Sequence, residues 1–192
     1  MANGAVEEIS LNPVSYVVLG FADQWAAELT SYDLKQMVAG SVGYFWSFPH
    51  SQLYAEPARL AAAGYLDEEV ETGGRRRRLY RITPRGRKAL QTWLAEPIGD
   101  GTEVRDLGLL KLFFAAAGSP DTVTRLAEEQ RAVHEQNLAG YDALHEAICG
   151  TAGEWELATL DLGRRFEQMA VDFWADVTRQ AQGKRLRGER LR

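Results

Sequence analysis

Between residues 65 and 82 the spacing of apolar residues changes, and this short interruption constrains the fold more than any other feature of the chain. The flanking segments place apolar residues every three or four positions, as helices do, whereas YLDEEVET and RRRRLYRI are short stretches typical of strands. Gly73 and Gly74 separate the two stretches, and a double glycine suits the tip of a β-hairpin. One two-stranded hairpin is therefore expected within an otherwise helical sequence.

Helices are expected on both sides of the hairpin, three before it and one after it. Residues that commonly begin or end helices mark their bounds, namely Asn12 with Pro13, Ser31, Gly40, Gly64, and Thr83 with Pro84. The third helix is expected over residues 49–63 and the fourth over 84–93. The order helix, helix, helix, strand, strand, helix is typical of a winged helix-turn-helix domain.

The segment IGDGT, residues 98–102, is the expected boundary between this domain and an entirely helical second half. Beyond it the spacing predicts a helix over 104–117 and two long helices over 120–149 and 154–182, which a short turn joins into an antiparallel hairpin. A single hairpin has only itself to bury its apolar stripes against, so a second copy of the chain is expected to complete the packing. The expected fold is mainly α, with a winged helix-turn-helix domain over 1–97, a helical dimerisation domain with long antiparallel helices over 103–183, and a basic tail over 184–192.

Charge is distributed unevenly along the chain. The formal net charge is -5, yet residues 75–88 hold eight basic residues and no acid, and the tail KRLRGERLR adds five more basic residues. Phosphate binding depends on local positive charge rather than on the sum over the protein. An acidic body with one basic patch therefore favours a protein that presents one face to DNA.

Several other classes of protein are disfavoured. The acidic start lacks the pattern of a signal peptide, and the most apolar stretch, 107–117, is too short to span a bilayer, so a cytoplasmic protein with no membrane partner is expected. The single cysteine, Cys149, excludes an internal disulfide, and with three scattered histidines it leads us to expect neither a metal nor another cofactor. No nucleophile elbow, phosphate loop or metal-ligand spacing is present, so the chain is not expected to be an enzyme.

The segments SQLYAEPARLAAAGYL and GGRRRRLYRITPRGRKALQTWL resemble the PadR family of bacterial regulators. The resemblance rests on Tyr54, Leu60, Gly64, the basic run Arg75–Arg78 and the turn Ile82–Gly86, in that order. The second half, from DLGLLKLFFAAAGSP to FWADV, is similar to the C-terminal domain of the long PadR members, which is named after virulence activator alpha. The resemblance implies a transcription regulator whose partners are double-stranded DNA and a second copy of itself. Since some members bind flat aromatic effectors at the dimer interface, it also adds a small aromatic effector to the expected partners.

In a helix-turn-helix domain the exposed N-terminal part of the third helix, the recognition helix, enters the major groove of DNA. There Gln52 has the groups to bind adenine bidentately, whereas Tyr54 is expected either to touch phosphate or to lie in the core. The hairpin arginines are expected on phosphates or in a narrow minor groove, because no acid stands among them, and the alternative is a solvated charge run. The expected DNA-binding residues are Ser31, Tyr32, Ser47, His50, Ser51, Gln52, Tyr54, Arg59, Arg75, Arg76, Arg77 and Arg78.

Two prolines depart from the family's pattern. Pro57 stands where PadR proteins usually have an apolar helix former, and an interior proline removes one backbone donor and can kink a helix. Pro49 replaces the usual hydroxyl cap of the recognition helix, which shifts the expected capping role toward Ser47. A bend at Pro57 would change the orientation of the recognition helix.

The expected dimer interface lies along the two long helices. Within the stripe of the first of them, Gln130 and Asn137 either fix the register of the dimer, as buried amides do in coiled coils, or lie beside the seam. The tryptophans are expected in core or interface packing, with stacking on a ligand as the alternative. The expected interface residues are Leu144, Trp155, Leu162, Phe166, Met169, Phe173, Trp174 and Val177.

The expected function is sequence-specific regulation of transcription by a homodimer on a pseudo-palindromic operator, with repression favoured over activation. The alternative is a winged helix that contacts an acidic protein and binds no specific DNA. Salt distinguishes the two, because DNA binding weakens steeply and log-linearly as salt is added.

Overall fold

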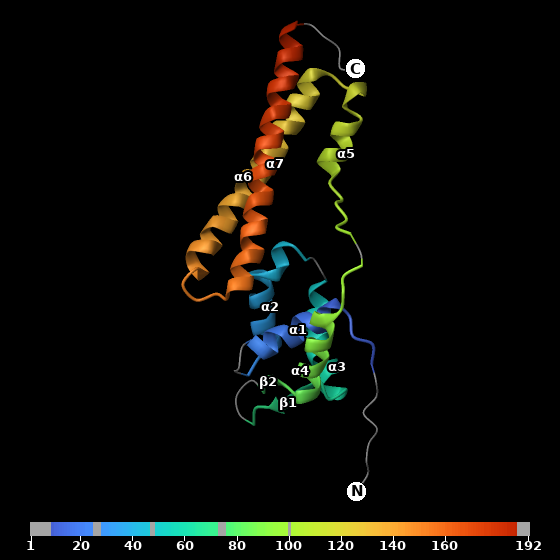
Figure 1. Cartoon of the computed structure of the whole chain (residues 1–192), viewed down its shortest axis with the longest axis vertical. Helices are drawn as coiled ribbons and strands as arrows, with labels where there is room; N and C mark the ends of the chain where they lie inside the picture. The colour runs from blue at the N-terminus through green and yellow to red at the C-terminus, as the bar shows by residue number, and fades with distance from the viewer. Residues whose placement is uncertain (1–8, 25–27, 47–48, 73–75, 100, 188–192) are drawn as a thin grey trace. The chain divides into compact units, whose positions relative to one another are not determined.

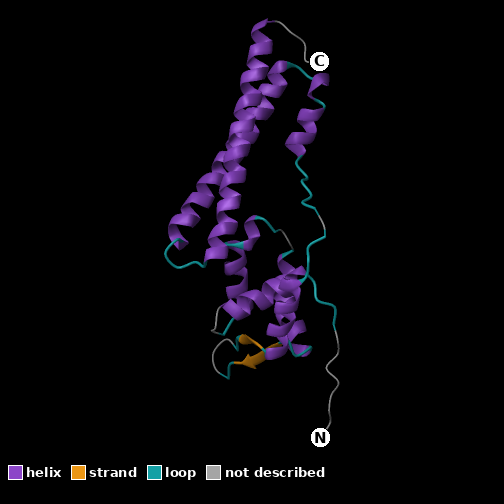
Figure 2. Ribbon diagram, viewed as in Figure 1, coloured by secondary structure: helices purple, strands orange, loops and turns teal. Residues whose placement is uncertain are grey.

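The computed structural model describes residues 9–24, 28–46, 49–72, 76–99 and 101–187. Contacts within the chain divide it into two compact units, residues 1–100 and 101–192, called here the N-terminal and C-terminal units. Helices dominate both units, and the sheet that the described residues form consists of two antiparallel strands (Figure 2).

The N-terminal unit has the element order of a winged helix-turn-helix domain. Its elements are α1 (Pro13–Gln24), α2 (Ser31–Ala39), the 3-10 helix η1 (Val42–Tyr44), α3 (His50–Ala62), β1 (Leu66–Val70), β2 (Arg78–Ile82) and α4 (Pro84–Ala95) (Figure 1). The strands pair from Leu66 opposite Ile82 to Val70 opposite Arg78, so the predicted hairpin is confirmed. We call α3 the recognition helix and the β1–β2 hairpin the wing.

Local side chains explain where these helices begin. Asn12 caps α1 as predicted, since its Oδ1 accepts hydrogen bonds from the backbone N–H groups of Val14 at 2.9 Å and Ser15 at 3.2 Å. The prediction of Ser31 as the cap of α2 is wrong by one residue. Thr30 is the cap: its Oγ1 accepts from the Asp33 N–H at 3.1 Å, and the Asp33 carboxylate accepts from the Thr30 N–H at 3.0 Å.

The core of the N-terminal unit forms where α1, α2 and α3 meet the wing. Its fully buried aliphatic side chains are Val18, Leu19, Leu34, Leu53, Leu60 and Leu66. The corner between β2 and α4 closes on this core, because Thr83 Oγ1 donates to the Gly64 carbonyl at 2.8 Å and accepts from the Gly86 N–H at 3.0 Å. A Cβ at Gly86 would overlap the carbonyl oxygen of Tyr65, so only glycine fits at this corner.

Pro57 does not end the recognition helix. The helix runs without interruption from His50 to Ala62, and the side chain of Pro57 is fully buried. Proline lacks the N–H that would donate to the carbonyl of Leu53, so the helix continues with one backbone hydrogen bond fewer. At the start of the helix, Pro49 occupies the N-cap position without a side-chain hydrogen bond, and Ser47, predicted to take over capping, lies outside the described residues.

The C-terminal unit contains α5 (Leu107–Phe113), the 3-10 helix η2 (Ala115–Ala117), α6 (Pro120–Ile148) and α7 (Glu154–Arg187). The single helix predicted over 104–117 is wrong at both ends, because Asp106 caps α5 through the Leu109 N–H at 3.1 Å and the α-helix stops at Phe113. The predicted hairpin of long helices is confirmed: α6 and α7 run side by side, and α7 continues past the predicted end at residue 182 (Figure 1).

The hairpin has a small core of its own. Ala127 of α6 packs with Ala170 and Trp174 of α7, and Trp174 is only 1% exposed. This corrects the assignment of Trp174 to the dimer interface, since a single chain already buries it. Asn137, considered as a fixer of dimer register, donates to Glu167 Oε1 of the same chain at 3.4 Å. No helix among the described residues combines the length and apolarity needed to cross a bilayer.

Candidate nucleic-acid interface

The N-terminal half of the recognition helix presents a polar surface. Leu53 is completely buried and anchors the helix, whereas Ser51, Gln52 and Tyr54 are exposed. Tyr54 is 47% exposed, so the alternative that it belongs to the core is wrong. The polar groups in this half of the helix are therefore accessible to a binding partner, as they are in helix-turn-helix proteins that read base edges.

Exposed aromatic side chains precede the recognition helix in the chain. Tyr32, at the start of α2, is 62% exposed, and its hydroxyl accepts a hydrogen bond from Gln36 Nε2 at 2.9 Å. Phe45 and Trp46 follow η1 and are 59% and 48% exposed. Their exposure was not predicted, because an aromatic loop between two helices usually signals packing rather than a surface. Ser31, predicted with Tyr32, is half-buried.

Arg77 and Arg78 of the wing have acidic partners, so the expectation that no acid neutralises the wing arginines is wrong for these two. Arg78 Nη1 lies 2.8 Å from Glu68 Oε1, and Arg77 Nε lies 3.1 Å from Glu71 Oε2. The Glu68 carboxylate raises the pKa of Arg78. The acids belong to β1 and the segment after it, so only the antiparallel register brings them opposite the basic run. Arg76, at φ 49°, is exposed and has no ion-pair partner among the described residues.

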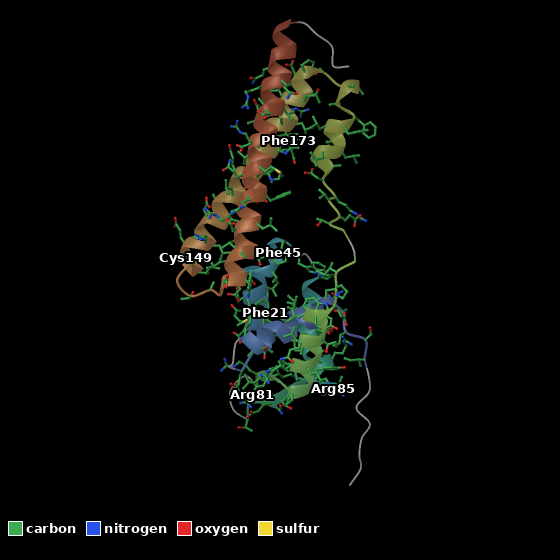
Figure 3. All side chains as sticks on the ribbon, viewed as in Figure 1. Phe21, Phe45, Arg81, Arg85, Cys149 and Phe173 are labelled. Carbon is green, nitrogen blue, oxygen red and sulfur yellow. The ribbon has the colours of Figure 1, made fainter. Side chains whose placement is uncertain are left out.

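The basic residues that follow the wing tip are also engaged within the unit. Arg81 pairs with Glu28 and, at 3.4 Å, with Glu69 Oε2. The Arg85 guanidinium lies 4.5 Å from the centroid of the Tyr65 ring, a cation–π contact (Arg81 and Arg85 are labelled in Figure 3). The basic patch seen in the sequence therefore carries less free charge than its composition suggests.

Arg59 is not placed as predicted. Its guanidinium forms a bidentate pair with Glu56, with Nη2 2.6 Å from Oε1 and Nε 2.9 Å from Oε2. The same guanidinium also donates to the Ser10 carbonyl at 3.2 Å and to Ser15 Oγ at 3.1 Å. These contacts engage Arg59 within its own unit, and its contact with DNA stays a prediction. Two further predicted contacts, Ser47 and Arg75, lie outside the described residues, as does the side chain of His50.

The predicted dimer residues on α7 form an exposed apolar face of the C-terminal unit, with Trp174 and Val177 excepted. We call the exposed set Trp155, Leu162, Phe166, Met169 and Phe173 the outer face of α7 (Phe173 is labelled in Figure 3). Leu144 and Val177 are half-buried, and Val177 packs against the core of the hairpin. An apolar face of this extent on a long helix usually marks a surface that another protein surface covers.

Comparison with known proteins identifies both units. Residues 18–92 match the Transcriptional regulator PadR-like family, and residues 104–181 match the family Virulence activator alpha C-term. The chain is 26% identical over 154 residues to the negative transcriptional regulator PadR of Bacillus subtilis, which covers 78% of this chain and 82% of that relative.

Solved structures of PadR share the fold. The chain superposes on Bacillus subtilis PadR in complex with operator DNA with a TM-score of 0.78 at 22% identity, over 88% of this chain and 99% of the other. It superposes on the same protein in complex with p-coumaric acid with a TM-score of 0.74 at 22% identity, over 90% of this chain and 99% of the other. The matched families and relatives are regulators rather than enzymes, as expected. The chain belongs to the PadR-like family of transcriptional regulators.

Proposed function

We propose that this regulator binds specific DNA sequences through the recognition helix and the wing. The observation that supports this most is the exposed polar start of α3, where Ser51 and Gln52 extend from a helix anchored by the buried Leu53. Gln52 has the amide group that pairs with adenine in the major groove. Arg76 is exposed at the tip of the wing and has no ion-pair partner among the described residues, so its guanidinium is available to a phosphate or a narrow minor groove.

The regulator acts as a homodimer on a pseudo-palindromic operator. The outer face of α7 supports this, because a second copy of the chain would remove its five large apolar side chains from water. Residues 103–183 then form the dimerisation domain, residues 1–97 the DNA-binding domain and 184–192 a basic tail. Two recognition helices related by a twofold axis read half-sites about 34 Å apart, which is one turn of DNA.

The outcome of binding is repression, with release by a small aromatic effector. The Bacillus subtilis relative is a negative regulator, and a structure of it contains p-coumaric acid. A dimer bound over a promoter blocks polymerase, and an effector that prefers the DNA-free state shifts the equilibrium away from the operator.

A winged helix that contacts an acidic protein is the second candidate. The observation that favours it is the pairing of Arg77 and Arg78 with Glu71 and Glu68, which lowers the charge the wing offers to phosphate. Such a protein would bind its partner without preference for any DNA sequence.

The test begins with immobilised full-length protein and fragmented genomic DNA. Fragments that survive washing with non-specific competitor are sequenced, and a short duplex is made from the sequence they share, called here the selected duplex. Sequence-specific DNA binding predicts that fragments from one or a few sites are enriched, and that affinity for them falls log-linearly as salt is added. Retention of no DNA, or uniform retention of all fragments, would leave the protein-binding candidate and overturn the proposal.

A further inference from the structure

A partly buried ionic cluster joins the recognition helix to α1, with the Arg59 side chain 37% exposed. Ser15 of α1 is completely buried, and Glu56 of α3 is 7% exposed. Ser15 Oγ donates to Glu56 Oε1 at 2.5 Å, and Arg59 holds both carboxylate oxygens at 2.6 and 2.9 Å. We call Ser15, Glu56 and Arg59 the α1–α3 cluster.

The cluster also reaches the segment before α1. The Asn12 backbone N–H donates to Ser15 Oγ at 2.9 Å, while Arg59 donates to Ser15 Oγ at 3.1 Å and to the Ser10 carbonyl at 3.2 Å. One hydroxyl can donate once and accept twice, so the hydrogen-bonding capacity of Ser15 is filled. Ser15 and Arg59 therefore link the Glu56 carboxylate to α1 and to the segment before it.

Few other directional interactions fix the orientation of the recognition helix. Its first turn has no side-chain cap, because Pro49 occupies the N-cap position, and Pro57 removes the hydrogen bond to the Leu53 carbonyl. Glu56 lies one helical turn after Gln52, so a rotation of α3 at Glu56 moves Gln52 with it. Aliphatic packing at Leu53 and Leu60 buries the helix but tolerates small rotations better than a bidentate ion pair does.

We propose that the α1–α3 cluster sets the orientation in which the recognition helix meets DNA, and that Arg59 is a positioning residue rather than a DNA contact. A buried ion pair is a weak source of stability compared with apolar packing, but it has a single favourable geometry and so suits this role. The inference rests on the proposed DNA binding, and it adds residues that act without touching the nucleic acid.

The direction in which one substitution changes DNA affinity distinguishes a positioning role from direct contact with DNA. Glu56→Gln keeps the size of the side chain and removes its charge. If Arg59 positions the helix, Glu56→Gln lowers affinity for the selected duplex by about tenfold or more, the loss expected for one base contact, and changes affinity for a random duplex of equal length by less than about threefold. If Glu56 only withholds Arg59 from phosphate, the same substitution raises affinity for both duplexes and overturns the proposal.

Two further variants complete the experiment. Arg59→Gln should reproduce the loss caused by Glu56→Gln, and the double variant should lose little more, because both substitutions break the same pair. Leu90→Ala, which destabilises the same unit from α4, is the control for stability and should leave the ratio of the two affinities unchanged. Additive losses on both duplexes from the double variant would make Arg59 a DNA contact and overturn the proposal.

Amide hydrogen exchange without DNA gives an independent readout. Glu56→Gln and Ser15→Ala should each speed exchange in residues 51–56 of α3 more than in α4, whereas Leu90→Ala should not. Unchanged exchange in α3 would overturn the inference even for a protein that binds DNA. A parent protein that binds no DNA, with exchange in α3 altered as expected, would refute the proposed function alone.

Discussion

Arg78 on β2 and Glu68 on β1 form an ion pair across the wing, with Nη1 2.8 Å from Oε1. Arg77 and Glu71 form a similar pair at 3.1 Å. Both arginines are more than half exposed, so a phosphate can approach them only in competition with a carboxylate already present. Glu68 and Glu71 therefore reduce the general affinity of the wing for nucleic acid and leave Arg76 as its free cation among the described wing residues.

Removing one acid should strengthen DNA binding. We expect Glu68→Gln to raise affinity for a random duplex by about two- to fivefold, because an exposed ion pair is weak and its removal frees Arg78 for phosphate. The freed Arg78 should also steepen the dependence of affinity on salt by up to about one unit of slope. Filter binding or fluorescence anisotropy at several salt concentrations measures both quantities.

Glu103→Gln is the matched control for this prediction. It removes the same charge from a pair with Arg105, in the C-terminal unit, and should leave the salt slope unchanged. Weaker binding by Glu68→Gln would contradict the proposed competition between acid and phosphate.

Gly86 should tolerate no side chain. Gly86→Ala places a methyl group against the Tyr65 carbonyl and within 3.0 Å of Ile82 Cγ1, so we expect a loss of about 3 kcal/mol in the free energy of unfolding. Gly20→Ala is the control, since a Cβ there meets nothing within 4 Å, and it should stabilise the helix by about 0.5–1 kcal/mol. Denaturant titrations measure both, and equal stabilities for the two variants would refute the packing at this corner.

Local signals predicted most of the fold. Asn12 with Pro13 and Thr83 with Pro84 mark helix starts through bonds to residues two or three positions away, and the structure has these helices where they were expected. The cap of α2 was missed by one residue because both Thr30 and Ser31 carry a hydroxyl, and the choice depended on the reciprocal bond from Asp33. The break at Phe113 has no comparable sequence signal.

The site was less predictable because its contacts are long-range. The spacing of Arg59 and Glu56 on one helix allowed their pairing to be predicted, but the serine partner of Arg59 lies 44 residues away on α1. The partners of Arg77 and Arg78 depend on strand register, which a run of arginines does not reveal. On α7, Phe173 and Trp174 are neighbours in an apolar stripe, yet one is 41% and the other 1% exposed, because a one-residue step turns a helix by about 100°.

The outer face of α7 should hold the dimer together. Phe166→Glu introduces a charge where a second copy is proposed to pack, so sedimentation at micromolar concentration should show a monomer with its helix content retained. Gln168→Glu adds the same charge at an exposed position on another side of the helix and should leave the dimer intact. A monomeric parent, or a Phe166→Glu variant that remains dimeric, would exclude this face as the interface.

Glu56 should contribute stability that acid removes. Burial alone would raise the pKa of Glu56, but hydrogen bonds from Arg59 and Ser15 and the charge of Arg59 outweigh it and lower the pKa below its usual value. Because the pKa of Glu56 is lower in the folded state, its ionised form stabilises the protein at pH values above the unfolded pKa of about 4.3. This stabilisation is lost as pH falls through the pKa of the folded state. The difference in unfolding free energy between the parent and Glu56→Gln should therefore shrink on acidification from neutral pH. A difference that grows toward acid would contradict this assignment.

We propose that the recognition helix reads DNA sequence and that the wing contacts the DNA backbone. The ratio of affinities for the selected and the random duplex tests this directly, measured for the parent, Gln52→Ala and Arg76→Ala under one salt condition. We expect Gln52→Ala to lower affinity for the selected duplex by about 1–3 kcal/mol with little change on the random duplex, so the ratio falls. Arg76→Ala should lower both affinities equally and leave the ratio unchanged. If Gln52→Ala retains the ratio of the parent, or if neither variant differs from the parent on any duplex, α3 and the wing do not divide DNA recognition in this way.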